Sequence, residues 1–275
     1  MTESVGRIAG RFAELAQAGK RALIPYIVAG DPFKDFTVQL MHRLVAAGAD
    51  IIELGVPFSD PMAEGPVIAR GHQRALEKGV SLRDVLAMVA SFRQTDQQTP
   101  VLLMGYANPV EGMGYEQFAG AASEAGLDAL LTVDMPLEEV GALNSELKQV
   151  GIDNIFLVAP TTSRERIEKI AEVATGFVYY VSFKGVTGAG LLDVEAVGQR
   201  LEEIRRCCDL PLAVGFGIRD PETAAAVARV ADGVVVGSAI VQLMADQAEA
   251  GAGPEAVAEA AAKQLAALRS AIDDR

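Results

Sequence analysis

Eight short apolar runs, each followed by a stretch with helical spacing, constrain the fold of this chain more than any other feature of its sequence. The runs are nearly continuous in Val, Ile, Leu and Phe, which is typical of strands that are buried on both faces. They cover residues 22–29, 50–56, 101–106, 129–134, 154–159, 177–182, 212–217 and 233–238. Eight strands that alternate with helices in 275 residues predict an α/β fold, a parallel sheet closed into a (β/α)8 TIM barrel. An open doubly wound sheet is the alternative.

Helices are expected between these strands, over residues 35–47, 81–93, 115–125, 163–174, 194–208 and 221–231. Ser163 and Asp220 stand where N-caps are expected, and Gly48, Gly126 and Gly151 stand where helices should end. An extra N-terminal amphipathic helix over residues 3–18 is predicted to cover the bottom of the barrel, and an Ala-rich helix over residues 254–272 is predicted to pack outside it. No linker interrupts this pattern, so residues 1–275 are expected to form a single TIM-barrel domain.

The charge balance is acidic, with 37 Asp and Glu against 24 Lys and Arg and a formal net charge of −13. Binding to nucleic acid or to an anionic membrane needs clustered positive charge, so neither partner is expected. No uncharged apolar stretch reaches the ~18–20 residues of a membrane helix, and the N-terminus has no apolar signal-peptide centre. Cys207 and Cys208 are adjacent, so they cannot close a framework of disulfides and are expected to be ordinary helix residues. These features predict a reduced, cytoplasmic protein that acts on a small molecule or with another protein.

The second strand contains a carboxylate, Glu53, among apolar residues. A buried charge without a partner costs several kcal/mol, so this residue is expected to be ion-paired, protonated or functional. The following loop, over residues 57–66, is stiffened by Pro and Gly and carries two more acids, Asp60 and Glu64. Because a TIM barrel has its active site at the C-terminal ends of the strands, the pattern favours acid–base catalysis over a salt-bridged core glutamate.

Glycine-rich loops follow three of the later strands. Three glycines lie within residues 185–190, which suits a mobile lid or a site for an anion. Gly217 follows the seventh strand, and Gly237 follows the eighth strand and opens a helix. Glycines after strands seven and eight beside a helix N-terminus are the usual phosphate pocket of such barrels, with ligand-free tight turns as the alternative.

The sequence lacks the residues that Schiff-base catalysis, metal binding and dinucleotide binding require. No strand core contains a Lys that could form a Schiff base, and Lys184 lies on a glycine loop, where a solvated side chain is the simpler interpretation. His42 and His72 lack the spacing of metal ligands. No dinucleotide or phosphate-loop motif follows a strand. The sequence therefore favours a phosphorylated small molecule that is handled by carboxylates alone.

The run from Glu53 to Pro66, ELGVPFSDPMAEGP, closely resembles the signature of the tryptophan synthase α subunit family. The match continues in the same order over essentially the whole chain, at residues 25, 30–32, 106–108, 134–136, 185–188, 215–218 and 237–241. The acidic run is specific to this family, whereas the glycine loops are shared with other phosphate-binding barrels. The resemblance implies a carbon–carbon lyase that performs the retro-aldol cleavage of indole-3-glycerol phosphate to indole and glyceraldehyde 3-phosphate.

The resemblance also implies roles for individual residues. Glu53 matches the acid–base carboxylate of the family, and Glu64 stands where the family more usually has an aspartate that holds the indole N–H. The substrate-binding positions would be Tyr26, Tyr106, Leu131 and Tyr179 around the indole, Gly188, Gly217, Gly237 and Ser238 around the phosphate, and Thr187 and Phe216.

A partner protein is implied as well. Members of the family form an αββα complex and pass indole through a tunnel to a β subunit that carries pyridoxal phosphate, so no cofactor and no metal are expected in this chain. Pro57, Asp60 and Asn108 match interface positions of the family. A β partner is expected to contact them.

The residues themselves are compatible with this chemistry. Cleavage needs protonation of indole C3 and removal of a proton from the side-chain hydroxyl, and a carboxyl group in an apolar strand has a raised pKa that suits both transfers. A second carboxylate that faces the ring N–H would stabilise the positive charge that develops there. Two alternatives stay open: a phosphosugar isomerase of the same barrel class, and a catalytically weakened paralogue that only docks on a β subunit and activates it. Glu64 is the feature that favours the paralogue.

Overall fold

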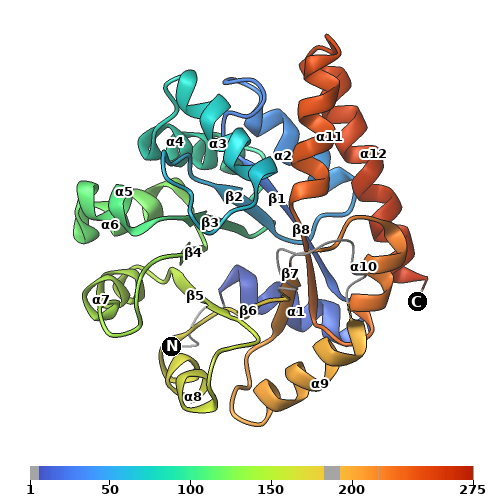
Figure 1. Ribbon diagram of the computed structural model, residues 1–275. Helices are drawn as coiled ribbons and strands as arrows, with labels where there is room; N and C mark the ends of the chain where they lie inside the picture. Colours follow the sequence, from blue (N-terminus) through green and yellow to red (C-terminus); the bar gives the residue numbers. More distant parts are fainter. Residues whose placement is uncertain (1–5, 183–192, 216, 275) are drawn as a thin grey trace.

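Eight parallel strands close into a barrel in the order β1 to β8, as Figure 1 shows. The structure is a computed structural model that describes residues 6–182, 193–215 and 217–274. The strands are β1 (Ala22–Val28), β2 (Ile52–Gly55), β3 (Val101–Gly105), β4 (Ala129–Thr132), β5 (Asp153–Val158), β6 (Val178–Val181), β7 (Leu212–Gly215) and β8 (Gly233–Val236). The closed barrel confirms the predicted fold and contradicts the open doubly wound sheet.

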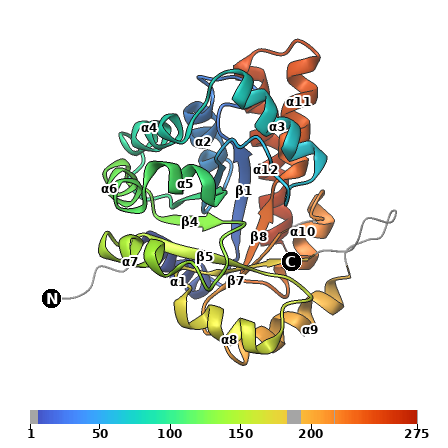
Figure 2. The same ribbon diagram turned by 60° about the vertical axis from the view of Figure 1, so that its left-hand side comes forward.

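Helices surround the strands and bury their outer faces (Figures 1 and 2). They are α2 (Thr37–Ala46), α3 (Pro66–Glu77), α4 (Leu82–Arg93), α5 (Ala107–Met113), α6 (Tyr115–Ala125), α7 (Gly141–Gln149), α8 (Arg164–Val173), α9 (Val194–Arg205), α10 (Pro221–Ala228), α11 (Ser238–Glu249) and α12 (Pro254–Asp273). The C-terminal helix α12 packs against α2, α10 and α11 on the outside of the barrel, as its composition predicted. In the described part of the chain, no helix is both long enough and apolar enough to cross a membrane.

The N-terminal helix α1 (Arg7–Gln17) covers the N-terminal end of the barrel and lies behind the strands in Figure 1. The Phe12 ring packs against the ring of Phe177, just before β6, with 5.6 Å between the centroids. Arg7 donates a hydrogen bond of 2.7 Å to Asp128, just before β4, and buried Arg93 donates to the same carboxylate at 2.5 Å. The predicted helix therefore closes the bottom of the barrel, as expected.

The helix boundaries follow the caps that the sequence predicted. The Ser163 and Asp220 side chains accept hydrogen bonds from backbone N–H groups in the first turns of α8 and α10. Gly48, Gly126 and Gly151 have φ values of 102°, 79° and 72°, which are favourable for glycine, and they end α2, α6 and α7. One expectation is wrong: α9 ends at Arg205, so the two cysteines follow the helix instead of lying in it, and both are free.

Every strand ends one or two residues before the expected C-terminal end. Several residues that follow the strands, among them Ala29 and Val56, are still buried and still donate backbone hydrogen bonds to the neighbouring strand, so the apolar run extends past the end of the strand. Tyr106 and Gly237 directly follow β3 and β8, and Gly217 lies two residues after β7. This end of the barrel carries the predicted site.

Candidate active site

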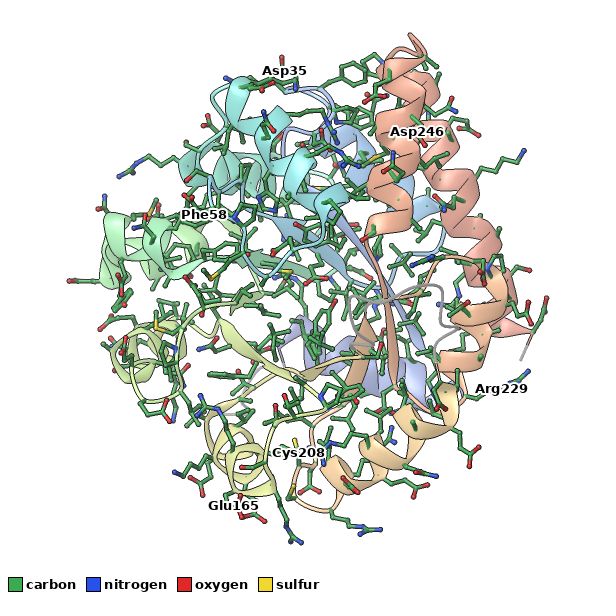
Figure 3. The ribbon with its side chains drawn as sticks, in the orientation of Figure 1. Asp35, Phe58, Glu165, Cys208, Arg229 and Asp246 are labelled. Atoms are coloured by element: carbon green, nitrogen blue, oxygen red, sulfur yellow. The ribbon has the colours of Figure 1, made fainter. Side chains whose placement is uncertain are left out.

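The strand register brings the predicted indole-contacting residues onto one face of the sheet. Tyr26 pairs with Glu53 across β1 and β2, Glu53 pairs with Leu102 across β2 and β3, and Leu131 follows from the same alternation on β4. Paired residues in a ladder share a face, so these side chains point the same way. The same alternation reaches Tyr179 on β6, because Tyr179 pairs with Ala213, whose partner Gly233 pairs with Ala22 on β1. Burial raises the pKa of Tyr179, and the charges of Glu53 and Glu64 add to the rise, although β6 lies across the barrel from β2. The shared face is therefore the barrel interior, which side chains fill in Figure 3.

Glu53 is a fully buried carboxyl group without a partner in the described residues. Its side chain is inaccessible to solvent, and neither carboxylate oxygen makes a hydrogen bond. Burial, with a further contribution from the charge of Glu64, raises the pKa of Glu53 to about 8. Within the described part of the chain, the salt-bridged alternative for this residue is therefore wrong.

Glu64 is held at the edge of the barrel by Tyr106. The Tyr106 hydroxyl donates a hydrogen bond of 2.6 Å to Glu64 Oε2 and accepts one of 3.0 Å from the backbone N–H of Ala63. The ring of Phe58, labelled in Figure 3, stacks on the Tyr106 ring with 4.8 Å between the centroids. Burial raises the pKa of Glu64, and the Tyr106 hydrogen bond opposes that rise. The sequence suggested Tyr106 as a wall of the indole pocket and did not reveal that it anchors the acidic loop.

Two tyrosines, Tyr26 and Tyr179, bring their hydroxyl groups over glycines at the ends of neighbouring strands. A Cβ atom added to Gly55 would lie 2.3 Å from the Tyr26 hydroxyl oxygen, and one added to Gly215 would lie 2.1 Å from the Tyr179 hydroxyl oxygen. Only glycine leaves room for the hydroxyl groups at these places. Leu131 is fully buried on the same interior face.

The predicted phosphate loops meet at one end of two adjacent strands. Gly217 follows β7 with a φ of 80°, and Gly237 follows β8 and is the N-cap of α11, whose first residue is Ser238. Because β7 and β8 pair with each other, these loops are neighbours. The predicted residues Thr187, Gly188 and Phe216 lie outside the described residues.

The three residues predicted to contact a partner differ in exposure. Asp60 and Asn108 are exposed, whereas Pro57 is buried within this chain. Met62, on the same loop as Asp60, is 86% exposed, which is unusual for a large apolar side chain.

Sequence reasoning missed His72, a buried residue of α3 that contacts both Tyr26 and the acidic loop. No local signal could identify it, because its partners lie 46 and 14 residues away along the chain. No cluster of His, Cys, Asp and Glu suited to a metal ion occurs among the residues that the structure describes.

Comparisons with known proteins agree with the geometry. Residues 12–271 match the family model described as tryptophan synthase alpha chain. A tryptophan synthase alpha chain from Thioalkalivibrio sulfidiphilus is 59% identical over 269 residues, 98% of this chain and 100% of the relative. The crystal structure of tryptophan synthase subunit alpha from Legionella pneumophila is 44% identical, with a TM-score of 0.91 over 99% of this chain and 100% of that one. The tryptophan synthase complex from Pyrococcus furiosus is 36% identical, with a TM-score of 0.79 over 90% of this chain and 98% of that one.

These similarities extend over nearly the whole chain, and none of them favours the isomerase or the weakened paralogue. They agree with the interior carboxylate, the acidic loop and the glycine turns at the C-terminal end of the barrel. The chain belongs to the tryptophan synthase alpha chain family, the lyases that cleave indole-3-glycerol phosphate to indole and glyceraldehyde 3-phosphate.

Proposed function

We propose that this chain performs the cleavage of indole-3-glycerol phosphate with two carboxylates, Glu53 as the group that transfers protons and Glu64 as the partner of the indole N–H. The environment of Glu53 is the observation that supports this most strongly. Its two oxygens are buried and have no hydrogen-bond partner among the described residues, and its pKa is raised to about 8. A carboxyl group that is protonated near neutral pH can first donate a proton and then accept one.

The reaction starts with transfer of the Glu53 proton to indole C3, which turns the ring into an electron sink. The Glu53 carboxylate then removes the proton from the side-chain hydroxyl next to the ring. The electrons of that O–H bond form the carbonyl group of glyceraldehyde 3-phosphate, the bond between C3 and the side chain breaks, and its electrons restore the indole ring. Glu53 is protonated again at the end, so this one residue both donates and accepts a proton in each turnover.

Glu64 supplies negative charge where the ring nitrogen becomes positive. Tyr106 holds Oε2 of the carboxylate at 2.6 Å, which orients the side chain and leaves Oε1 for the indole N–H. Because the charge develops in the transition state, an oriented carboxylate lowers the barrier more than it strengthens substrate binding.

Phosphate binding is assigned to the turns after β7 and β8. Gly217, Gly237 and Ser238 bring backbone N–H groups and the N-terminus of α11 to one place, where the helix dipole favours an anion. Tyr26, Leu131 and Tyr179 form the apolar interior beside it, and Thr187, Gly188 and Phe216 are expected to complete the substrate pocket.

A β subunit is proposed to dock on the acidic loop and α3. Exposed Asp60 and Met62 flank Pro61, which lines a groove of about 600 Å³ together with Phe58 and Leu76. Exposed Asn108 on α5 is proposed to extend the same interface. Pro57 is covered by its own chain and contributes less surface than its neighbours. The Pyrococcus furiosus relative is described as a complex, which supports a partner for this chain.

The finer assembly follows from the family. We assign an αββα heterotetramer in which indole passes to the β subunit, which holds pyridoxal phosphate for L-tryptophan synthesis; the mechanism above uses no cofactor in this chain. We also assign residues 1–275 to one domain and the protein to the cytoplasm, which suits its two free cysteines.

The proposal is tested by measuring indole release from indole-3-glycerol phosphate, alone and with a β subunit. Glu53→Gln keeps the shape of the side chain and cannot exchange the protons, so kcat is expected to fall by about 10²–10⁴-fold or more while KM changes much less. Near-normal turnover of this variant would remove Glu53 from the mechanism.

A further inference from the structure

His72 connects the interior of the barrel to the acidic loop. Its Nε2 atom lies 3.2 Å from the hydroxyl oxygen of Tyr26, and its Nδ1 atom lies 3.1 Å from the backbone nitrogen of Phe58. The imidazole is 1% exposed, so it exchanges neither contact for water. Tyr26 is on β1 and Phe58 is in the loop after β2, and one side chain of α3 therefore ties two neighbouring strand ends together.

The direction of both hydrogen bonds is set by the backbone. The N–H of Phe58 can only donate, so Nδ1 of His72 must be the acceptor and carries no proton. Burial lowers the pKa of His72 to about 4, which keeps the ring neutral at physiological pH. A neutral ring without a proton on Nδ1 carries it on Nε2, and Nε2–H donates to the Tyr26 oxygen.

The Tyr26 hydroxyl is left with a proton to donate. His72 occupies one acceptor position of the oxygen, and Tyr26 makes no other side-chain hydrogen bond in the described residues. The hydroxyl lies over the Cα atom of Gly55, two residues beyond Glu53 on β2, and side chains two residues apart on a strand share a face. The free O–H therefore lies on the interior face that carries Glu53, towards the end where substrate enters.

The position of His72 is itself fixed by an ion pair that Arg74, two residues along α3, makes with a buried carboxylate. Arg74 binds Asp31, three residues after β1, through two hydrogen bonds of 2.6 and 2.8 Å. Asp31 is fully buried, and a Cβ atom at Gly71 would lie 3.1 Å from its carboxylate, so α3 packs directly on this segment. The helix holds the imidazole against Tyr26 with little freedom to move.

We propose that His72 is a positioning residue for the cleavage: its Nε2–H orients the Tyr26 hydroxyl so that Tyr26 donates a hydrogen bond to the substrate oxygen that Glu53 deprotonates. This inference rests on the proposed function. As the proton leaves for Glu53, negative charge develops on that oxygen before the carbonyl forms. A fixed donor stabilises this charge more than it stabilises the neutral hydroxyl of bound substrate.

The first experiment is a double-mutant cycle read out as kcat and KM for indole-3-glycerol phosphate. Tyr26→Phe removes only the hydroxyl, and we expect kcat to fall about tenfold with KM changed by less than about threefold. His72→Asn keeps an acceptor for the Phe58 N–H and is too short to reach Tyr26, so kcat should fall by about three- to tenfold. In the Tyr26→Phe background, His72→Asn should cost no further kcat, because its effect passes through the absent hydroxyl.

His72→Gln is the matched control, because its Nε2–H₂ group can reach Tyr26. It should recover most of the kcat that His72→Asn loses, and thermal unfolding of every variant separates lost stability from lost turnover. A purely structural role for His72 predicts the same loss of kcat in both Tyr26 backgrounds, and that result would overturn the proposal. Parent-like kcat for Tyr26→Phe would also overturn it. If Glu53→Gln is inactive in the same assay, the proposed function is retained and only the positioning role of His72 is rejected.

A tautomer measurement covers the case in which His72→Asn does not fold. The chain has only two histidines, so His42→Gln leaves one imidazole to observe by ¹⁵N nuclear magnetic resonance. The neutral Nε2–H form is expected for His72 at pH 7. An Nδ1–H form or an imidazolium would mean that His72 cannot orient Tyr26 in the way described, and the proposal would fall.

Discussion

At the scale of single residues, Glu53 is the position where the needs of folding and of the reaction conflict most, because the carboxyl group that transfers protons is fully buried. Its pKa is about 8 in the folded chain against 4.5 when solvated, so the folded state holds a proton that the unfolded state releases between these values. The stability that the protonated group contributes is therefore fully present below pH 4.5 and is lost as the pH rises through 8.

Glu53→Gln removes this dependence, because an amide does not titrate. Relative to the variant, the parent should lose up to about 4 kcal/mol of unfolding free energy between pH 5 and pH 8. Urea unfolding at several pH values measures the difference, with Glu172→Gln, a change at an exposed acid of α8, as the control. A parent-minus-variant difference that stays constant with pH would contradict the raised pKa.

Glu64 is the residue at which the chain departs from the usual family pattern. One more methylene than aspartate moves the carboxylate by roughly 1–1.5 Å, and Tyr106 takes up the longer side chain at 2.6 Å. Glu64→Ala should lose roughly 10²-fold in kcat because the ring cation has no counter-charge, while Glu64→Asp should be mild. Steady-state indole release measures both variants. If Glu64→Ala cleaves the substrate as fast as the parent, Glu64 is not the partner of the indole N–H.

At the scale of elements, the sequence predicted the strands better than the connections. All eight strands were identifiable because a strand buried on both faces is a continuous apolar run, and that signal is local. Helices α3, α5 and α7 were not anticipated. Two begin beside the glycines and prolines of the site loops, and α7 buries only Leu143 and Leu147.

The candidate site was predictable to the extent that its residues are marked in the sequence. Glu53 and Glu64 stand out as a carboxylate in an apolar strand and an acid on a stiff loop, and the turns at Gly217 and Gly237 follow strands. The Tyr106 clamp on Glu64 spans 42 residues, and the contact of His72 with Tyr26 spans 46, so both depend on the closed barrel. Long-range pairing of this kind leaves no local pattern.

The phosphate assignment can be tested at the start of α11. Ser238→Asp adds a carboxylate to the first turn of this helix, where the helix dipole stabilises it, so folding stability should hold or rise slightly. The same charge repels a bound phosphate, and KM should rise by about tenfold or more with a smaller effect on kcat. Ser238→Asn, similar in size and neutral, is the matched control. Equal KM values for both variants would put the phosphate elsewhere.

Across the whole molecule, the two ends of the barrel have separate tasks. The N-terminal end is covered by α1. Arg7 and Arg93 donate hydrogen bonds to Asp128 there, so the buried carboxylate is paired and serves stability. The C-terminal end keeps the carboxyl group of Glu53, which has no partner in the part of the chain that the structure describes, and the exposed loop that follows it. This division is usual in TIM barrels. The N-terminal face contributes to stability, and the C-terminal face carries the active site.

The exposed part of the acidic loop also links the site to the proposed β partner. Glu64 is fixed to Tyr106, and four residues earlier Asp60 is exposed beside Met62. A partner that binds Asp60 would restrict the loop and favour the position of Glu64 that the reaction needs, by shifting the population of loop conformations.

Asp60→Ala should therefore lower the stimulation of cleavage by a β subunit by about five- to tenfold, while unassisted cleavage is expected to change less than about twofold because Asp60 is an exposed residue of the loop. The measurement is indole release at saturating substrate, with and without a titrated β subunit. Glu172→Ala removes an equally exposed carboxylate from α8, away from the loop, and should leave both rates unchanged. Equal losses of assisted and unassisted cleavage in Asp60→Ala would show that Asp60 acts within its own chain and would contradict its place at the interface.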